Sequence, residues 1–139
     1  MNKIVVDASV MVSILFKDEE NKYSKSFLDC IKNGTKVIVP EIFHAEILNV
    51  LVVSEKRGRL NSDNTQKILR FLLDLNFLTI SHLDKEDVLE LAKMYSLTSY
   101  DAIYLSLAKK EGLQLATLDK KLEKACVSEG AFWSGDIMG

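Results

Sequence analysis

Four acidic side chains stand where carboxylates can act together on one cation. Asp7 ends the β-branched run in KIVVDAS, and Asp119 closes the apolar run LQLATLD. Glu46 lies inside the apolar segment IFHAEILNVLVV, and Asp101 is near the start of YDAIYLSLA. Carboxylate oxygens favour Mg²⁺ or Mn²⁺ over zinc, and such a cation can activate water beside a phosphodiester. If the fold gathers the four acids, the sequence predicts metal-dependent phosphoryl chemistry.

Three of these acids also have an ordinary structural explanation. Asp7 or Ser9 can cap the helix after the first apolar run, and Asp119 can cap the last helix. Thr98 and Asp101 have the spacing of a capping box, in which the threonine caps the helix and the acid returns a hydrogen bond. For each acid taken alone, capping and cation binding stay equally open.

Glu46 has a weaker structural explanation than the other acids. The helix around it is apolar on almost every side, and burying a lone carboxylate is costly unless it is paired or binds a cation. Asn49 follows one helical turn later and is expected to hydrogen-bond it. The alternative is a surface glutamate whose carboxylate reaches water.

Short apolar runs alternate with segments of helical periodicity along the chain. Strands are expected at residues 3–7, 35–40, 76–81 and 113–117, with an edge strand at 131–133. Helices are expected at residues 10–16, 23–34, 41–56, 62–75, 84–96, 98–112 and 119–130. This alternation predicts right-handed crossovers and one three-layer α/β/α domain over residues 1–139, with a mostly parallel sheet of four to five strands.

A parallel sheet gives the four acids a common meeting place. Functional groups of such sheets gather beyond the carboxyl ends of the strands. Asp7 and Asp119 follow expected strands, while Glu46 and Asp101 lie near the starts of helices that follow a strand or a loop. All four are therefore expected at one rim, where a cation would offset their mutual repulsion.

Composition excludes several other classes of protein. The net charge is −2, so the chain lacks the basic field of a simple nucleic-acid binder, although an acidic catalytic site remains compatible with it. No apolar run approaches the roughly 18 residues that span a bilayer. We do not expect VVDASVMVSILF to be a signal peptide, because it contains Asp7 and no cleavage site follows it. Cys30 and Cys126 lack metal-site spacing and are expected to be reduced thiols. A cytoplasmic protein is the simplest expectation.

Three stretches make the sequence resemble a known family. They are IVVDASVMVSIL, VPEIFHAEILNVL and LTSYDAIYLSLAKKEGLQLATLDKKLEKA, and together they span nearly the whole chain in order. The sequence resembles the PIN-domain ribonucleases, and most closely the VapC-type toxins of toxin–antitoxin pairs. A DAxY helix followed by a strand and T-x-D is the most specific part of the match. The family's four acids fall on Asp7, Glu46, Asp101 and Asp119.

The resemblance implies an endoribonuclease that depends on Mg²⁺ or Mn²⁺, forms a homodimer and is inhibited by a small antitoxin encoded beside it. It implies that Asp7, Asp101 and Asp119 hold the metal, while Glu46 holds water or accepts a proton. The family's hydroxyl residues fall on Ser9 and Thr117, which would orient the carboxylates or phosphate.

Two questions remain open from the sequence. Lys120 and Lys121 follow Asp119 directly, and they are either RNA phosphate contacts or ordinary solvated lysines. The domain could also be a PIN nuclease that processes RNA or acts on DNA, or a module without catalysis that serves protein assembly. Retention of all four acids argues against the last of these alternatives.

Overall fold

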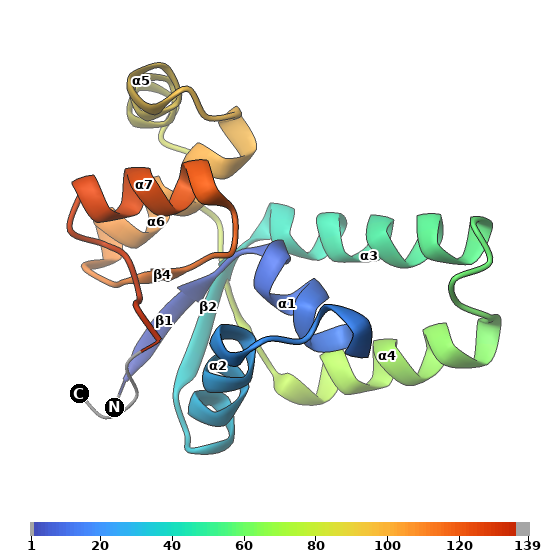
Figure 1. Cartoon of the computed structure of the whole chain (residues 1–139). Helices are drawn as coiled ribbons and strands as arrows, with labels where there is room; N and C mark the ends of the chain where they lie inside the picture. Colours follow the sequence, from blue (N-terminus) through green and yellow to red (C-terminus); the bar gives the residue numbers. More distant parts are fainter. Residues whose placement is uncertain (1, 136–139) are drawn as a thin grey trace.

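The computed structural model describes residues 2–135, which fold around one parallel sheet (Figure 1). The strands are β1 (Lys3–Val6), β2 (Lys36–Pro40), β3 (Leu78–Ile80) and β4 (Leu115–Ala116). The helices are α1 (Ala8–Leu15), the 3₁₀ turn η1 (Lys17–Glu19), α2 (Lys22–Lys32), α3 (Glu41–Lys56), α4 (Ser62–Leu75), α5 (Lys85–Tyr95), α6 (Ser99–Glu111) and α7 (Lys120–Ser128). The predicted three-layer α/β/α architecture is confirmed.

The order of the strands indicates where a functional site is expected. All four strands are parallel in the order β3-β2-β1-β4, so the chain leaves β1 first toward β2 and β3 and later returns to its other side as β4. In the register of the sheet, Val5 of β1 lies between Ile38 of β2 and Leu115 of β4. The carboxyl end of β1 is therefore the point at which strand order switches, the usual location of a site in such sheets.

The predicted edge strand at residues 131–133 is shorter than expected. Its pairing with β4 is a single parallel bridge between Leu115 and Phe132. The Leu115 amide donates to the Ala131 carbonyl at 2.7 Å, and the Trp133 amide donates to the Leu115 carbonyl at 3.0 Å. Because β4 itself has only two residues, residues 131–133 cannot form a longer ladder with it.

Local signals set the helix ends as the sequence predicted. The Asn61 side chain accepts from the Asn64 amide at 2.8 Å and so caps α4, directly before the predicted start of this helix at residue 62. Gly112 ends α6 with a φ of 68°, a left-handed conformation that glycine adopts without steric cost.

The helices form two groups around the sheet (Figure 1). Helices α1 and α2 pack together, and α5, α6 and α7 pack together in a second group. Helices α3 and α4 extend away from the sheet as two arms, and α4 has no fully buried residue. None of the helices within residues 2–135 is long and apolar enough to cross a membrane.

Candidate functional site

Asp7 is a buried carboxylate at the switch point. It follows β1, caps α1, and is only 4% exposed. Its Oδ1 accepts from the Ser9 hydroxyl at 2.6 Å and from the Val10 amide at 3.3 Å, while its Oδ2 accepts from the Thr117 hydroxyl. Burial raises the pKa of Asp7 from 3.8 to about 6, although the hydroxyl hydrogen bonds act in the opposite direction.

The two hydroxyls also fix the turn between β4 and α7. The Leu118 amide donates to Ser9 Oγ at 2.9 Å, and the Asp119 amide donates to Thr117 Oγ1 at 3.0 Å. Ser9 and Thr117 thus each accept from this turn and donate to Asp7. This double bridge holds the start of α7 beside the end of β1, as the predicted supporting role of both hydroxyls requires.

Asp119 and Asp101 stand at helix starts. Asp119 caps α7 because its Oδ1 accepts from the Leu122 amide at 2.9 Å. Thr98 caps α6 by accepting from the Asp101 amide at 3.1 Å. The other half of the predicted capping box is wrong, since no hydrogen bond within residues 2–135 runs from the Thr98 amide to the Asp101 carboxylate. Thr98 also bonds to the Asp101 side chain, which lowers the pKa of Asp101 against the larger effect of burial.

Glu46 has a different partner from the one predicted. It lies half-buried on α3, and the Tyr104 hydroxyl of α6 donates to its Oε1. No hydrogen bond joins Glu46 to Asn49 in the part of the chain that the structure describes, and Asn49 is exposed. The expectation for Asn49 was wrong because one helical turn places it toward solvent rather than toward the site. Tyr104 was not predicted as a site residue, although it lies one turn after Asp101 in YDAIY.

Asp101 lies within electrostatic reach of the other three acids. The charge on Asp101 helps to raise the pKa of Asp7. Burial raises the pKa of Asp101, and the charges on Asp119 and Glu46 raise it further. Such coupling between carboxylates is expected where acids share a site without a compensating cation. The acids nevertheless do not converge tightly, because residues 2–135 contain no group of three His, Cys, Asp or Glu side chains placed to hold one metal ion.

Carboxylate oxygens with unused lone pairs remain on Asp7, Glu46 and Asp119. Both lone pairs of Asp7 Oδ1 are used, but Oδ2 accepts a single hydrogen bond. Glu46 uses Oε1 and Asp119 uses Oδ1, so the second oxygen of each accepts nothing from residues 2–135. This all-oxygen set fits the ligand preference of Mg²⁺ or Mn²⁺ rather than that of a thiophilic metal.

Lys120 and Lys121 form the first turn of α7, directly after Asp119. Both are exposed, and neither makes an ion pair with any residue from 2 to 135. Their ammonium groups therefore remain available to an anionic ligand near the acids. The contact with RNA phosphates that was considered from the sequence stays a prediction.

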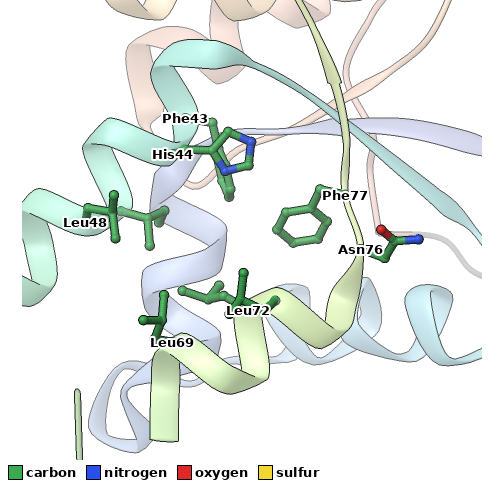
Figure 2. Close-up of a pocket in the computed structure, with 9 residues that line it drawn as sticks. Phe43, His44, Leu48, Leu69, Leu72, Asn76 and Phe77 are labelled. Carbon is green, nitrogen blue, oxygen red and sulfur yellow. The ribbon is translucent and has the colours of Figure 1, made fainter. Parts of the chain in front are cut away.

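An apolar groove lies between the two projecting arms (Figure 2). It has a volume of about 300 Å³, and its walls come from α3, α4 and the start of the following segment. His44 of α3 lines it, and His44 Nε2 lies 2.8 Å from the Thr79 hydroxyl of β3. The groove lining contains none of the four acids, so the groove is separate from the acidic site. The remaining lining residues are Phe43, Ile47, Leu48, Leu69, Leu72, Leu73, Asn76 and Phe77.

Comparison with known proteins places this geometry in a family. The PIN domain model matches residues 4–127. The chain is 28% identical over 123 residues to ribonuclease VapC3 of Pyrobaculum aerophilum, covering 86% of this chain and 92% of the relative. It is also similar to the crystal structure of PAE2754 from the same organism, with a TM-score of 0.71, 26% identity, and coverage of 94% of this chain and 83% of the other.

Two further solved structures share the fold at lower identity. The toxin–antitoxin complex from Klebsiella pneumoniae matches with a TM-score of 0.59 and 21% identity over 85% of this chain and 88% of the other. FitAcB from Neisseria gonorrhoeae matches with a TM-score of 0.65 and 20% identity over 89% of this chain and 93% of the other. The resemblance identified from the sequence is thus confirmed: the chain belongs to the PIN-domain family.

Proposed function

We propose that this chain is an endoribonuclease that depends on Mg²⁺ or Mn²⁺ and acts as the toxin of a toxin–antitoxin pair. The observation that carries the proposal is the coupling of Asp7, Glu46, Asp101 and Asp119 at the switch point of a PIN-domain sheet. The 28% identity to a relative named ribonuclease VapC3, over nearly the full length of both chains, supports RNA as the substrate.

The proposed chemistry assigns one task to each group. When bound, the cation supplies the charge that activates water and stabilises the phosphate oxygens. Asp7, Asp101 and Asp119 would hold it. Glu46 would orient water or accept its proton. Attack of water on phosphorus would break the P–O3′ bond, and the departing 3′-oxygen would take up a proton, leaving a 5′-phosphate and a 3′-hydroxyl.

The partners follow from the same proposal. The Klebsiella pneumoniae relative is a toxin–antitoxin complex, which supports a small antitoxin as the partner of this chain. The apolar groove between α3 and α4, whose lining residues Leu48 and Leu73 are 48% and 71% exposed, provides surface for an antitoxin or for a second copy in a homodimer.

Cleavage of labelled RNA with Mg²⁺, with Mn²⁺ and with a chelator tests the proposed activity. We expect wild-type cleavage only with a divalent cation, and a loss of roughly 100-fold or more in Asp7→Asn and Asp101→Asn. Asp29→Asn is the matched control, because Asp29 is an exposed aspartate on α2.

Four outcomes would contradict parts of the proposal. Equal cleavage by wild type, Asp7→Asn and Asp101→Asn would refute the carboxylate site. Products ending in 2′,3′-cyclic phosphate would refute attack by water. Cleavage of single-stranded DNA in preference to RNA would favour the alternative nuclease, and an inactive wild type with every metal and substrate would favour the assembly module.

A further inference from the structure

Tyr104 is a buried tyrosine whose hydroxyl contacts one of the four acids. The residue is 1% exposed and lies on α6, one helical turn after Asp101. Its hydroxyl donates to Oε1 of Glu46, which comes from a different helix, α3. A buried tyrosine hydroxyl needs a hydrogen-bond partner, and here a proposed catalytic carboxylate is that partner.

The surroundings keep this phenol neutral. Burial raises the pKa of Tyr104 far above its ordinary value of 10, and the charges on Glu46, Asp7 and Asp101 raise it further. The phenol is therefore a permanent donor at physiological pH. It can hold an ionised carboxylate without adding charge to a site that already contains four acids.

The hydrogen bond also resolves a problem of placement. Helix α3 leads away from the sheet beside α4 (Figure 1). Glu46 is only half-buried on this helix, so its carboxylate needs a contact to keep it from turning to water. No other hydrogen bond within residues 2–135 restrains its carboxylate. Anchoring Oε1 to α6, the helix of Asp101, directs Glu46 toward the other acids and leaves Oε2 open.

We propose that Tyr104 is a positioning residue that holds the Glu46 carboxylate beside Asp101, in the orientation needed to meet the cation and the reacting water. The inference rests on the proposed function. It assigns no contact between Tyr104 and RNA or metal, because the phenol acts through Glu46.

Tyr104→Phe removes the hydroxyl and keeps the buried ring. Removal of a group that orients a metal-site residue typically costs 10–100-fold in activity or metal affinity. We expect kcat to fall by roughly that factor with little change in KM for RNA, and Mn²⁺ binding measured by calorimetry without RNA to weaken at least several-fold. In a Glu46→Gln background, Tyr104→Phe should have little further effect on either quantity, because the two residues act as one unit.

Tyr95→Phe is a matched control. The Tyr95 hydroxyl donates to Glu129, a carboxylate outside the four-acid site, so this variant also removes a tyrosine–carboxylate hydrogen bond. We expect it to lower thermal stability and to leave kcat and Mn²⁺ affinity unchanged. Glu46→Asp is a second probe that leaves the buried Tyr104 ring in place. Aspartate keeps the negative charge, but its shorter side chain does not reach the Tyr104 hydroxyl. This variant should show the same losses in kcat and Mn²⁺ affinity as Tyr104→Phe.

The possible results separate this inference from the proposed function. If wild type is active while Tyr104→Phe and Glu46→Asp match it in kcat and Mn²⁺ affinity, the positioning role is wrong. If Tyr104→Phe lowers kcat and Mn²⁺ affinity in the Glu46→Gln background by the same factor as in wild type, Tyr104 does not act through Glu46. The inference is then overturned. A wild type that neither cleaves RNA nor binds Mn²⁺ overturns the proposed function itself, and the inference with it.

Discussion

Replacing Asp7 with asparagine should stabilise the protein at neutral pH in the absence of metal. Asp7 is 4% exposed, and burial raises its pKa from 3.8 to about 6. A difference of one in pKa corresponds to about 1.4 kcal/mol, so the ionised carboxylate lowers the free energy of unfolding by about 3 kcal/mol at pH 7. Asparagine has nearly the same shape as aspartate and carries no charge, so the substitution removes this cost. Large-to-small substitutions in the core, in contrast, destabilise a protein because they open cavities.

The net gain will be smaller than this upper value. Asparagine can still accept from Ser9 and Val10, but its amide must face the Thr117 hydroxyl, which now has to reorient. Allowing for this loss, we expect a gain of about 1–3 kcal/mol near pH 7.5. For a domain of this length that corresponds to an increase of roughly 3–12 °C in Tm.

The pH dependence identifies the cause. Because the folded pKa is raised, the folded state binds more protons than the unfolded state between about pH 4 and pH 6, and the contribution of Asp7 to stability falls as pH rises through that window. Above about pH 6 the free energy of unfolding loses little more from the ionisation of Asp7. The electrostatic part of the difference between Asp7→Asn and wild type should therefore shrink from about 3 kcal/mol near pH 7.5 to about 1 kcal/mol near pH 4.5.

Urea unfolding in a chelator at both pH values measures the difference. Trp133, the single tryptophan, is 9% exposed and reports unfolding by its fluorescence. The exposed Asp29→Asn variant should match wild type at both pH values. The reasoning fails if Asp7→Asn is no more stable than wild type near pH 7.5, or if its advantage does not depend on pH. Added Mn²⁺ should then stabilise wild type more than Asp7→Asn, if the proposed metal site is right.

Other contacts of the described chain give further expectations. Thr117→Val removes the hydroxyl that serves Asp7 and should cost about 1–3 kcal/mol in urea unfolding near pH 7.5; an unchanged midpoint would contradict the bridge between β1 and β4. Glu129→Gln weakens contacts with Tyr95 and Lys109 and should cost about 1–2 kcal/mol at pH 7. The tyrosine hydrogen bond lowers the pKa of Glu129 below 4.5, so the cost should disappear as pH falls through that lowered pKa; a cost that persists in acid would show a different cause.

The sequence determined the elements and their ends because these depend on residues close in the chain. Apolar runs defined the four strands, and caps such as Asn61 and Thr98 act on amides three residues away. The alternation of strands and helices then predicted the parallel three-layer fold. The four acids could be named for the same reason, since each stands at an element boundary or in an apolar helix.

Contacts between distant segments were decided by the tertiary structure alone. The Asn49 contact was expected from helical spacing and is absent from residues 2–135, and the capping box that was one explanation of Asp101 is only half formed there. Spacing shows which residues can meet within a helix but not which side chain a second helix brings closer. Glu46 finds Tyr104 across 58 residues of chain, and Asp7 finds Thr117 across 110. A buried carboxylate requires hydrogen-bond donors, and only the packed fold determines which donors reach it.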